Sequence, residues 1–163
     1  IAEQDKVAAY LAHQDAFKDH YGFVQAPFDE DFPRWWHHIH EHPSYDPSTF
    51  FLAVENGKEG EEIVGYIFCY AEDYEMPELA WIENVGVRRQ WRRRGLALAL
   101  LNHAFGEMYQ RGRMQVALAV DADSLTGATR LYEKAGMRTF RQFDRYSKEL
   151  RSGKALSTQT VTE

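Results

Sequence analysis

A run of arginines followed by a glycine stands where a predicted strand passes directly into a predicted helix. The segment is VGVRRQWRRRGLALALL, residues 85–101, and Gly95 stands just before the helical pattern. The first backbone N–H groups of a helix have no partner within the helix, and they lie at the positive end of its dipole. Such a junction binds anions, and a glycine lets a phosphate approach the backbone closely. The chemistry expected here is therefore the binding of a phosphorylated ligand.

The same residues resemble the pyrophosphate-binding turn of the GNAT superfamily of acyl-CoA-dependent N-acetyltransferases. Residues 92–97 read R-x-x-G-x-A and fit the superfamily pattern (Q/R)-x-x-G-x-(G/A), with Trp91 just before the turn. The resemblance implies that acetyl-CoA is the acyl donor and that its pyrophosphate is bound at the turn. The residues implied are Arg92, Arg93, Arg94, Gly95, Leu96 and Ala97.

Two other interpretations of the arginine-rich segment are a solvated basic helix start and an RNA-binding patch. Five arginines within seven positions oppose the dipole at a helix N-terminus, so a purely structural role would be mildly destabilising without a bound anion. The chain carries a net charge of -6, which disfavours general attraction to nucleic acid or to anionic membranes. Nucleic acid and membrane are therefore not expected as partners.

A second segment, VDADSLTGATRLYEKAGM at residues 120–137, resembles the GNAT motif N-x-x-A-x-x-L-Y-E-x-x-G-F. The resemblance places Tyr132 beside the cofactor sulfur, as the general acid that protonates the departing thiolate. Ser124 stands where asparagine is common, and we expect it to cap the helix and to contact the pantetheine arm. Without the first motif, Tyr132 would be interpreted as an ordinary core tyrosine.

Glu83 is the candidate base. An alkylamine with a pKa near ~10 is mostly protonated at neutral pH, so an amine acceptor must lose a proton before it attacks. Glu83 has the same parity as Val85 and Val87 along its strand, which predicts that all three share a face. The alternative is an exposed strand carboxylate paired with an arginine. The backbone N–H groups of Val85, Gly86 and Val87 are expected to bind the pantetheine amides, and one of them to polarise the thioester carbonyl.

The surrounding periodicity predicts an α+β domain in which helices flank a mostly antiparallel sheet. Its elements follow the order ααβββαβαβ, and the sheet is expected to open as a V between the strands at 79–87 and 113–120. An Asn-Gly turn is expected to join the first two strands, and Asp29 or Asp31 to cap the second helix. The predicted helices are 3–20, 27–42, 95–111 and 126–135, and the predicted strands are 49–56, 62–72, 79–87, 114–120 and, as a strand or hairpin, 137–150.

A single domain is expected over residues 1–150, followed by a Ser/Thr-rich tail at 151–163 that is disordered or docked on a partner. The GNAT resemblance is good over 49–150, but the first strand of that fold is missing upstream. A fragment, or the C-terminal half of a tandem protein similar to mycothiol synthase, would explain the missing strand.

Several side features narrow the expected chemistry. His38 and His42 are four residues apart on a helix, but zinc needs three or four ligands, so no metal is predicted. Cys69 lies in the apolar run IVGYIFCYA and is expected to be a buried packing group. Asp19, His20 and Tyr21, at the end of the first helix, are candidates to line an acceptor pocket, and Trp35 and Trp36 are expected to help form its wall. No segment reads as a signal peptide or a bilayer-spanning helix, so a soluble, cytoplasmic protein is expected.

The sequence therefore supports two hypotheses of function. The first is an N-acetyltransferase that moves acetyl from acetyl-CoA to a primary amine of a small molecule, protein or peptide by direct attack. The second is a non-catalytic acyl-CoA-binding module that regulates a partner. A homodimer and a neighbouring GNAT domain are the expected protein partners.

Overall fold

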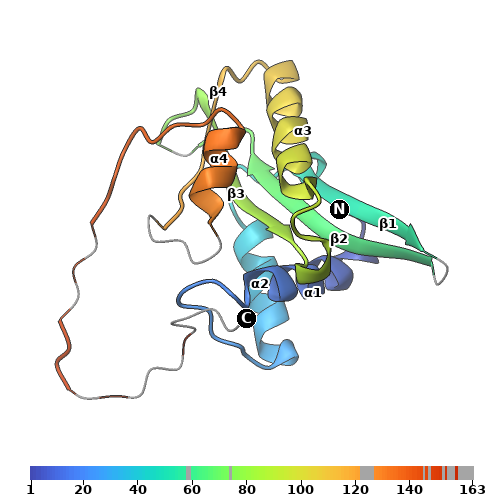
Figure 1. Cartoon of the computed structure of the whole chain (residues 1–163), viewed down its shortest axis with the longest axis vertical. Helices are drawn as coiled ribbons and strands as arrows, with labels where there is room; N and C mark the ends of the chain where they lie inside the picture. Colours follow the sequence, from blue (N-terminus) through green and yellow to red (C-terminus); the bar gives the residue numbers. More distant parts are fainter. Residues whose placement is uncertain are drawn as a thin grey trace.

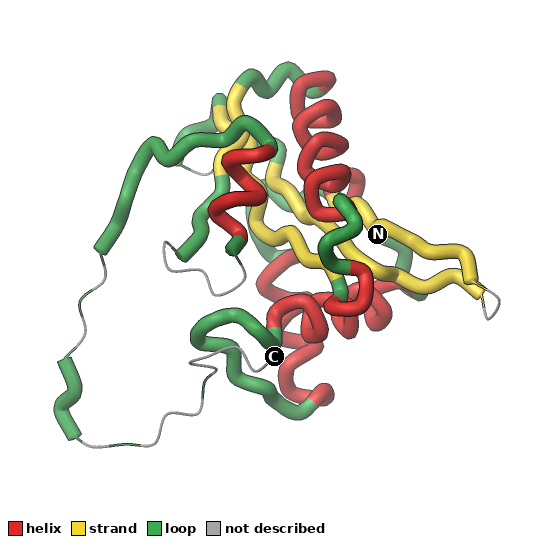
Figure 2. Tube along the Cα trace, viewed as in Figure 1, coloured by secondary structure: helices red, strands yellow, loops and turns green. Residues whose placement is uncertain are grey.

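The computed structural model describes residues 1–57, 60–73, 75–121, 127–144, 146, 148–151, 153 and 157. These residues form a four-stranded sheet in the order β1-β2-β3-β4, with helices on both of its faces (Figures 1 and 2). The two antiparallel pairings, β1 with β2 and β2 with β3, are followed by one parallel pairing of β3 with β4. The predicted mostly antiparallel α+β sheet is thus confirmed.

Two helices precede the sheet, as expected, but both are shorter than predicted. They are α1, Asp5–Phe17, and α2, Phe28–His40. The predicted N-cap of α2 is wrong, because Pro27 holds that position and the acidic residues that follow Phe28 fill the first turn. Carboxylates in the first turn favour the helix through its dipole without serving as the cap.

The hairpin consists of β1, Phe50–Gly57, and β2, Gly60–Tyr70. Its tip falls at positions 58 and 59, which lie outside the described residues. Gly57 pairs with Gly60 and the residue before it pairs with Glu61, so the Asn-Gly pair belongs to the end of β1. The hairpin is confirmed, but the Asn-Gly pair ends strand β1 and does not form the predicted turn.

The sheet opens between its last two strands. Strand β3 covers Leu79–Val87, whereas β4 covers only Gln115–Ala117, less than the predicted 114–120. The two strands pair in parallel over residues 79–81 of β3 and 115–117 of β4. Beyond this point no described strand pairs with β3 on the β4 side, which confirms the predicted V-shaped opening.

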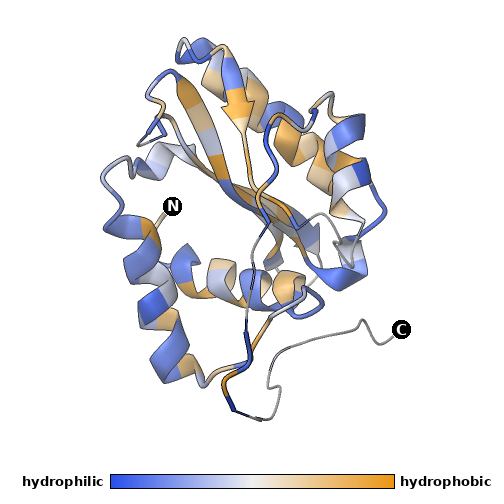
Figure 3. Ribbon diagram, turned by 90° about the vertical axis from the view of Figure 1, so that its left-hand side faces the viewer, coloured by the Kyte–Doolittle hydropathy of each residue, from blue (hydrophilic) through white to orange (hydrophobic). Residues whose placement is uncertain are grey.

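The sheet separates two apolar layers. One layer lies under α3, Leu96–Gln110, and includes Ile67, Cys69, Ile82 and Leu101. In Figure 1, α3 and α4, Ala128–Lys134, lie on this side, while α1 and α2 cover the other face. The strands and the inward helix faces carry most of the hydrophobic colour in Figure 3. The buried residues of the second layer are Ala9, Ile39, Phe50, Tyr66, Phe68 and Tyr70.

The expected strand or hairpin at 137–150 is absent from the described part of that segment. Residues 137–144 carry no regular structure and extend away from α4 (Figure 1). Phe140 and Phe143 are 55% and 84% exposed, respectively. An extended segment becomes a strand only when its backbone pairs with a neighbour, and no described strand pairs with this one. In the tail, only residues 151, 153 and 157 are described.

No described helix has the length and hydropathy required to span a bilayer.

Candidate functional site

The strand-to-helix turn presents a row of unpaired backbone donors. Gly95 is the N-cap of α3 with φ 85°, and Arg93 also has a positive φ of 61°. The first helical hydrogen bond runs from the N–H of Ala99 to the carbonyl of Gly95. No described acceptor receives the backbone N–H groups of residues 93–98, and no side chain caps the helix. Because these donors surround a helix N-terminus, the turn is suited to a pyrophosphate.

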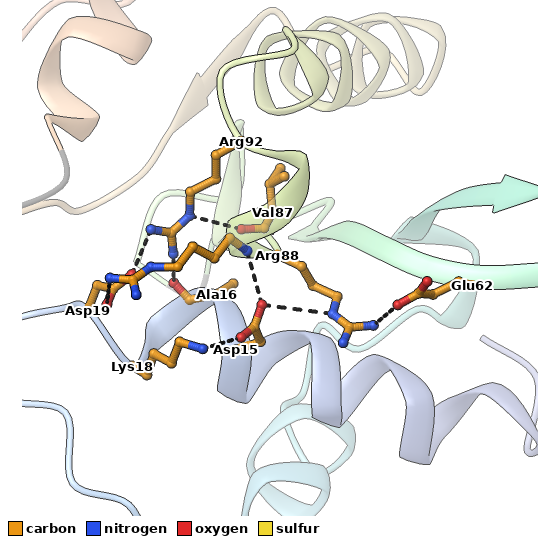
Figure 4. A network of polar contacts seen from close by, with 9 residues as sticks. Asp15, Ala16, Lys18, Asp19, Glu62, Val87, Arg88 and Arg92 are labelled. Carbon is orange, nitrogen blue, oxygen red and sulfur yellow. Dashed lines mark hydrogen bonds and ion pairs between the residues drawn. The ribbon is translucent and has the colours of Figure 1, made fainter. Parts of the chain in front are cut away.

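The side chain of Arg92 is held by the protein itself. Its Nε donates to the carbonyl of Val87 at 3.2 Å, and its Nη2 donates to the carbonyl of Ala16 at 2.9 Å. Its Nη1 donates to a carboxylate oxygen of Asp19 at 2.7 Å. Arg89 Nη2 donates to the other oxygen of Asp19 at 3.0 Å. Figure 4 shows these side chains converging between the turn and the end of α1.

Other carboxylates meet the neighbouring arginines. Arg88 contacts both Asp15 of α1 and Glu62 of β2. Arg94 lies 3.9 Å from Glu55. Four of the five arginines thus have a carboxylate partner, and Arg93 alone has none among the described residues, so the expectation of an uncompensated run is wrong. Carboxylates from α1, β1 and β2 supply the compensation, so the best support for an anion site is the row of unpaired N–H groups.

A β-bulge in β3 decides which way Glu83 faces. Phe68 pairs with Asn84 and Cys69 with Ile82, which leaves Glu83 as the extra residue between them. A bulge breaks the alternation of side chains along a strand. Val85 and Val87 pack in the α3 layer, whereas Glu83 hydrogen-bonds to groups of the α1/α2 layer. The prediction that these three residues share a face is therefore wrong.

Glu83 lies among aromatic groups on the α1/α2 face. Its carboxylate accepts a hydrogen bond from Trp81 Nε1 at 3.1 Å and lies 3.5 Å from His38 Nε2 of α2. Burial, followed by the negative charge of Glu83, raises the pKa of both Tyr66 and Tyr70. The hydroxyl of Tyr70 is buried and has no described partner. The alternative of an arginine partner for Glu83 finds no such contact among the described residues.

A cavity of about 490 Å³ lies on the same side of the sheet as Glu83, which is not among its lining residues. Its lining includes His13 of α1, Trp35 and His38 of α2, and Val24 of the connection between them. His38 lines the cavity and also contacts Glu83. The cavity is thus a candidate acceptor site, and sequence reasoning had foreseen Trp35, but not His13 or His38, in its wall.

His13 is held neutral inside this layer. Burial lowers its pKa from an ordinary 6.5 to about 4. Its Nδ1 shares a hydrogen bond of 2.6 Å with the hydroxyl of Tyr66, and burial raises the pKa of that phenol. The neutral imidazole adds no positive charge to the cavity, whose lining already includes Arg34.

The variant His13→Asn is expected to flatten the pH dependence of folding. Between pH 6.5 and 4 the unfolded chain binds a proton on His13 that the folded chain excludes, so wild-type stability falls as the pH falls. The effect is at most about 3 kcal/mol across this window. Urea unfolding at several pH values measures it, with the exposed His37→Asn as control. Equal slopes for wild type and His13→Asn would contradict the assignment.

Tyr132 lies on the opposite side of the sheet from Glu83. It projects from α4 and packs against the α3 layer, where burial raises its pKa. It therefore keeps its proton at neutral pH and has one to donate. No described contact joins Tyr132 to Glu83, and the two residues belong to different apolar layers.

Some predicted groups have no structural test. Ser124 lies outside the described residues. Among those that are described, no group of three or more His, Cys, Asp or Glu side chains could hold a metal ion.

His38 faces Glu83 while His42 stacks on Tyr70 at 3.8 Å between ring centroids, so these two histidines have different neighbours. Cys69 is fully buried, as predicted, and burial raises its thiol pKa to about 12.

Sequence reasoning missed the role of Asp19, which was expected to line an acceptor pocket. Asp19 is 7% exposed and is engaged by Arg89 and Arg92. The available signal was its spacing of four residues from Asp15, which places two carboxylates on one side of the end of a helix.

Comparisons with known proteins agree with this geometry. The model of the acetyltransferase (GNAT) family matches residues 9–137. A protein of Methanocaldococcus jannaschii, named an uncharacterized N-acetyltransferase, is 33% identical over 94 residues, which cover 56% of this chain and 39% of that protein. The crystal structure of a GCN5-related N-acetyltransferase from Sphaerobacter thermophilus is 40% identical, with a TM-score of 0.64, over 85% of this chain and 39% of that one.

A third similar structure is the ribosomal-protein-S18-alanine N-acetyltransferase from Escherichia coli. It is 25% identical, with a TM-score of 0.58, over 83% of this chain and 73% of that one. The chain thus spans about two fifths of the first two relatives and about three quarters of the third.

Proposed function

Because the chain belongs to the GNAT family of acetyltransferases, we propose that it transfers an acetyl group from acetyl-CoA to a primary amine. The observation that carries the proposal is the row of unpaired backbone N–H groups at residues 93–98, next to the opening between β3 and β4. The turn supplies donors for a pyrophosphate, and the opening supplies a place for the thioester arm.

The donor would be bound largely by backbone. The N–H groups of residues 93–98 would receive the pyrophosphate oxygens at the positive end of α3. Beyond Trp81, the β4 side of β3 has no described partner strand, and we propose that those backbone N–H groups of Val85, Gly86 and Val87 that face this side bind pantetheine amides. Arg93 is exposed and lies beside the turn, where its charge favours an anion.

Direct attack needs one group to take a proton and another to give one. Glu83, on the α1/α2 face, takes a proton from the ammonium form of the acceptor, directly or through a water molecule. The amine nitrogen then forms a bond to the thioester carbon and the carbon–sulfur bond breaks. Tyr132 protonates the leaving thiolate, the second proton lost by the nitrogen returns through water to the Tyr132 phenolate, and Glu83 releases its proton to solvent. The buried thiol of Cys69, with its raised pKa, is unsuited to form an acyl-enzyme.

The acceptor would enter from the cavity beside Glu83. Its walls combine aromatic rings with the ion pair of Asp31 and Arg34, and the neutral His13 adds no further positive charge. The aromatic rings and the Asp31 carboxylate are groups that can contact an amine carried on a small molecule or on a peptide. The Escherichia coli relative is named for acetylation of an alanine of a ribosomal protein. Peptide amines therefore belong among the acceptors to be tested.

The variant Glu83→Gln is expected to lower kcat/KM about 100-fold at pH 7, because the amide cannot accept the proton of the amine. The loss should shrink as the pH rises toward the pKa of the free amine, where the acceptor is already neutral. Thiol release measured from pH 6 to 10 reveals both effects. The exposed β2 carboxylate Glu61 gives the control Glu61→Gln, and an unchanged kcat/KM for Glu83→Gln at pH 7 would show that the proton leaves by another route.

Calorimetry with acetyl-CoA, followed by thiol release against a panel of small and peptide amines, tests the proposed function. Binding in the micromolar range together with turnover of at least one amine supports it. Binding without turnover of any amine would favour a non-catalytic acyl-CoA-binding module, and absence of binding would reject both. A homodimer, a neighbouring GNAT domain in a tandem protein and a cytoplasmic location stay predictions.

A further inference from the structure

We propose that Asp19 is a positioning residue that fixes the donor turn by holding Arg92 and Arg89 against the end of α1. The proposal rests on the proposed function, since it concerns how the acetyl-CoA turn is kept in its binding shape. We call the group formed by Asp19, Arg89 and Arg92 the α1 brace.

The brace is buried at its centre. The side chain of Asp19 is 9% exposed, and each of its oxygens accepts a hydrogen bond from a different arginine, at 3.0 Å from Arg89 and 2.7 Å from Arg92. Arg92 also donates to the main-chain carbonyls of Val87 and Ala16. The guanidinium of Arg92 is thereby fixed to the end of β3 and to α1 at the same time.

The position of Arg92 in the chain gives this fixation its effect. The next residue, Arg93, has a positive φ, and so does Gly95 two positions later. These two left-handed residues turn the backbone so that the N–H groups of residues 93–98 stay free of protein acceptors. A non-glycine residue in this conformation is strained and persists only when its surroundings hold it. The brace anchors the residue at which the strained turn begins.

The brace also ties the donor turn to the acceptor side. Helix α1 carries His13, which lines the cavity beside Glu83, and the brace lies at the carboxyl end of the same helix. Figure 4 shows the arginines of the turn reaching across to this end of α1. Movement of α1 relative to the sheet would therefore move the donor turn and the acceptor cavity together.

The test is the variant Asp19→Asn, which keeps the shape of the side chain but removes its charge. Its Kd for acetyl-CoA, measured by calorimetry on protein shown to be folded by circular dichroism, is expected to rise about 10- to 100-fold. Because Asp19 does not contact the reacting atoms, kcat at saturating acetyl-CoA should stay within about threefold of wild type. Amide hydrogen exchange at residues 93–98 should become faster.

A double-mutant cycle separates positioning from general loss of stability. After Arg92→Gln, the further change Asp19→Asn should raise the Kd by a much smaller factor than it does in the wild type, because only the Arg89 contact is left for it to remove. Glu62→Gln is the matched control, since it breaks an exposed ion pair to Arg88 near the same turn and should change Kd less than about twofold. If Asp19→Asn proves poorly folded, Arg89→Gln removes one of the two arginine contacts and should raise Kd by a smaller factor.

The outcomes separate this inference from the proposed function. Wild-type protein that fails to bind acetyl-CoA would reject the proposed function. Wild-type protein that binds, with folded Asp19→Asn binding equally well despite a lower Tm, would overturn the positioning role and leave the brace a purely structural ion-pair network.

Discussion

The variant Gly95→Val is expected to raise the Kd for acetyl-CoA about 100-fold. This factor corresponds to the loss of one to two charge-assisted hydrogen bonds between the backbone N–H groups of the turn and the pyrophosphate. Gly95 has φ 85° and an added Cβ would meet no protein atom within 4 Å. The side chain would instead enter the space in front of the unpaired N–H groups, where a pyrophosphate would lie. Calorimetry with coenzyme A measures the change.

Gly112 offers a control at the other end of the same helix. It has φ 79°, and an added Cβ there also meets nothing within 4 Å. Valine in this conformation costs about 1 to 3 kcal/mol of unfolding free energy at either position. Gly112→Val should therefore lose a similar amount of stability and keep wild-type affinity. Equal affinities for the two variants would contradict a donor site at the Gly95 turn.

The variant Tyr132→Phe is expected to lower kcat about 100- to 1000-fold, since the thiolate would leave without a positioned proton donor. The Kd for acetyl-CoA should stay within about twofold, because the ring that packs against the α3 layer is retained. Burial raises the pKa of Tyr132, so wild-type kcat should decline only in strongly alkaline solution, as the phenol loses its proton. The variant should lack that alkaline decline.

Steady-state thiol release from pH 6 to 11 distinguishes this role from simple packing. Tyr109→Phe, at an α3 position that is 65% exposed, is the matched removal of a hydroxyl and should leave kcat unchanged. Full activity of Tyr132→Phe at all pH values would remove the general acid from the mechanism. Protonation of the thiolate by water would then suffice.

The arginine-rich segment shows that a count of charges in the sequence does not reveal which charges are paired in the fold. From the sequence, five arginines at a helix start require an anion to compensate them. In the structure, Arg88, Arg89 and Arg92 are compensated by carboxylates that lie far away in the chain. The charges of Arg89 and Arg92, paired with Asp19, stabilise the position of the turn, while its backbone supplies the donors for a ligand. Acetyl-CoA affinity should therefore depend on these arginines mainly through the shape of the turn.

Glu83 shows how one inserted residue changes a prediction about faces. Strict alternation along the strand predicts that Glu83 shares a face with Val85 and Val87. The bulge between Ile82 and Asn84 reverses that relation and turns the carboxylate toward His38 and the acceptor cavity. A bulge leaves no reliable mark in a single sequence, because it is fixed by pairing with the neighbouring strand.

The sequence by itself determined the features that arise within a short stretch of chain. The helix start at Gly95, the hairpin and the order of the elements as far as α4 follow from the periodicity of nearby residues and from glycine, since these depend on local backbone energies. Only the tertiary structure decided what the side chains at the site do. Asp19 meets Arg92 across 73 positions and His38 meets Glu83 across 45, and such pairings depend on how α1 and α2 pack on the sheet. The backbone groups that would bind the donor are thus determined by the local sequence. The position of the turn and the shape of the acceptor cavity are determined by the packing of α1 and α2 on the sheet.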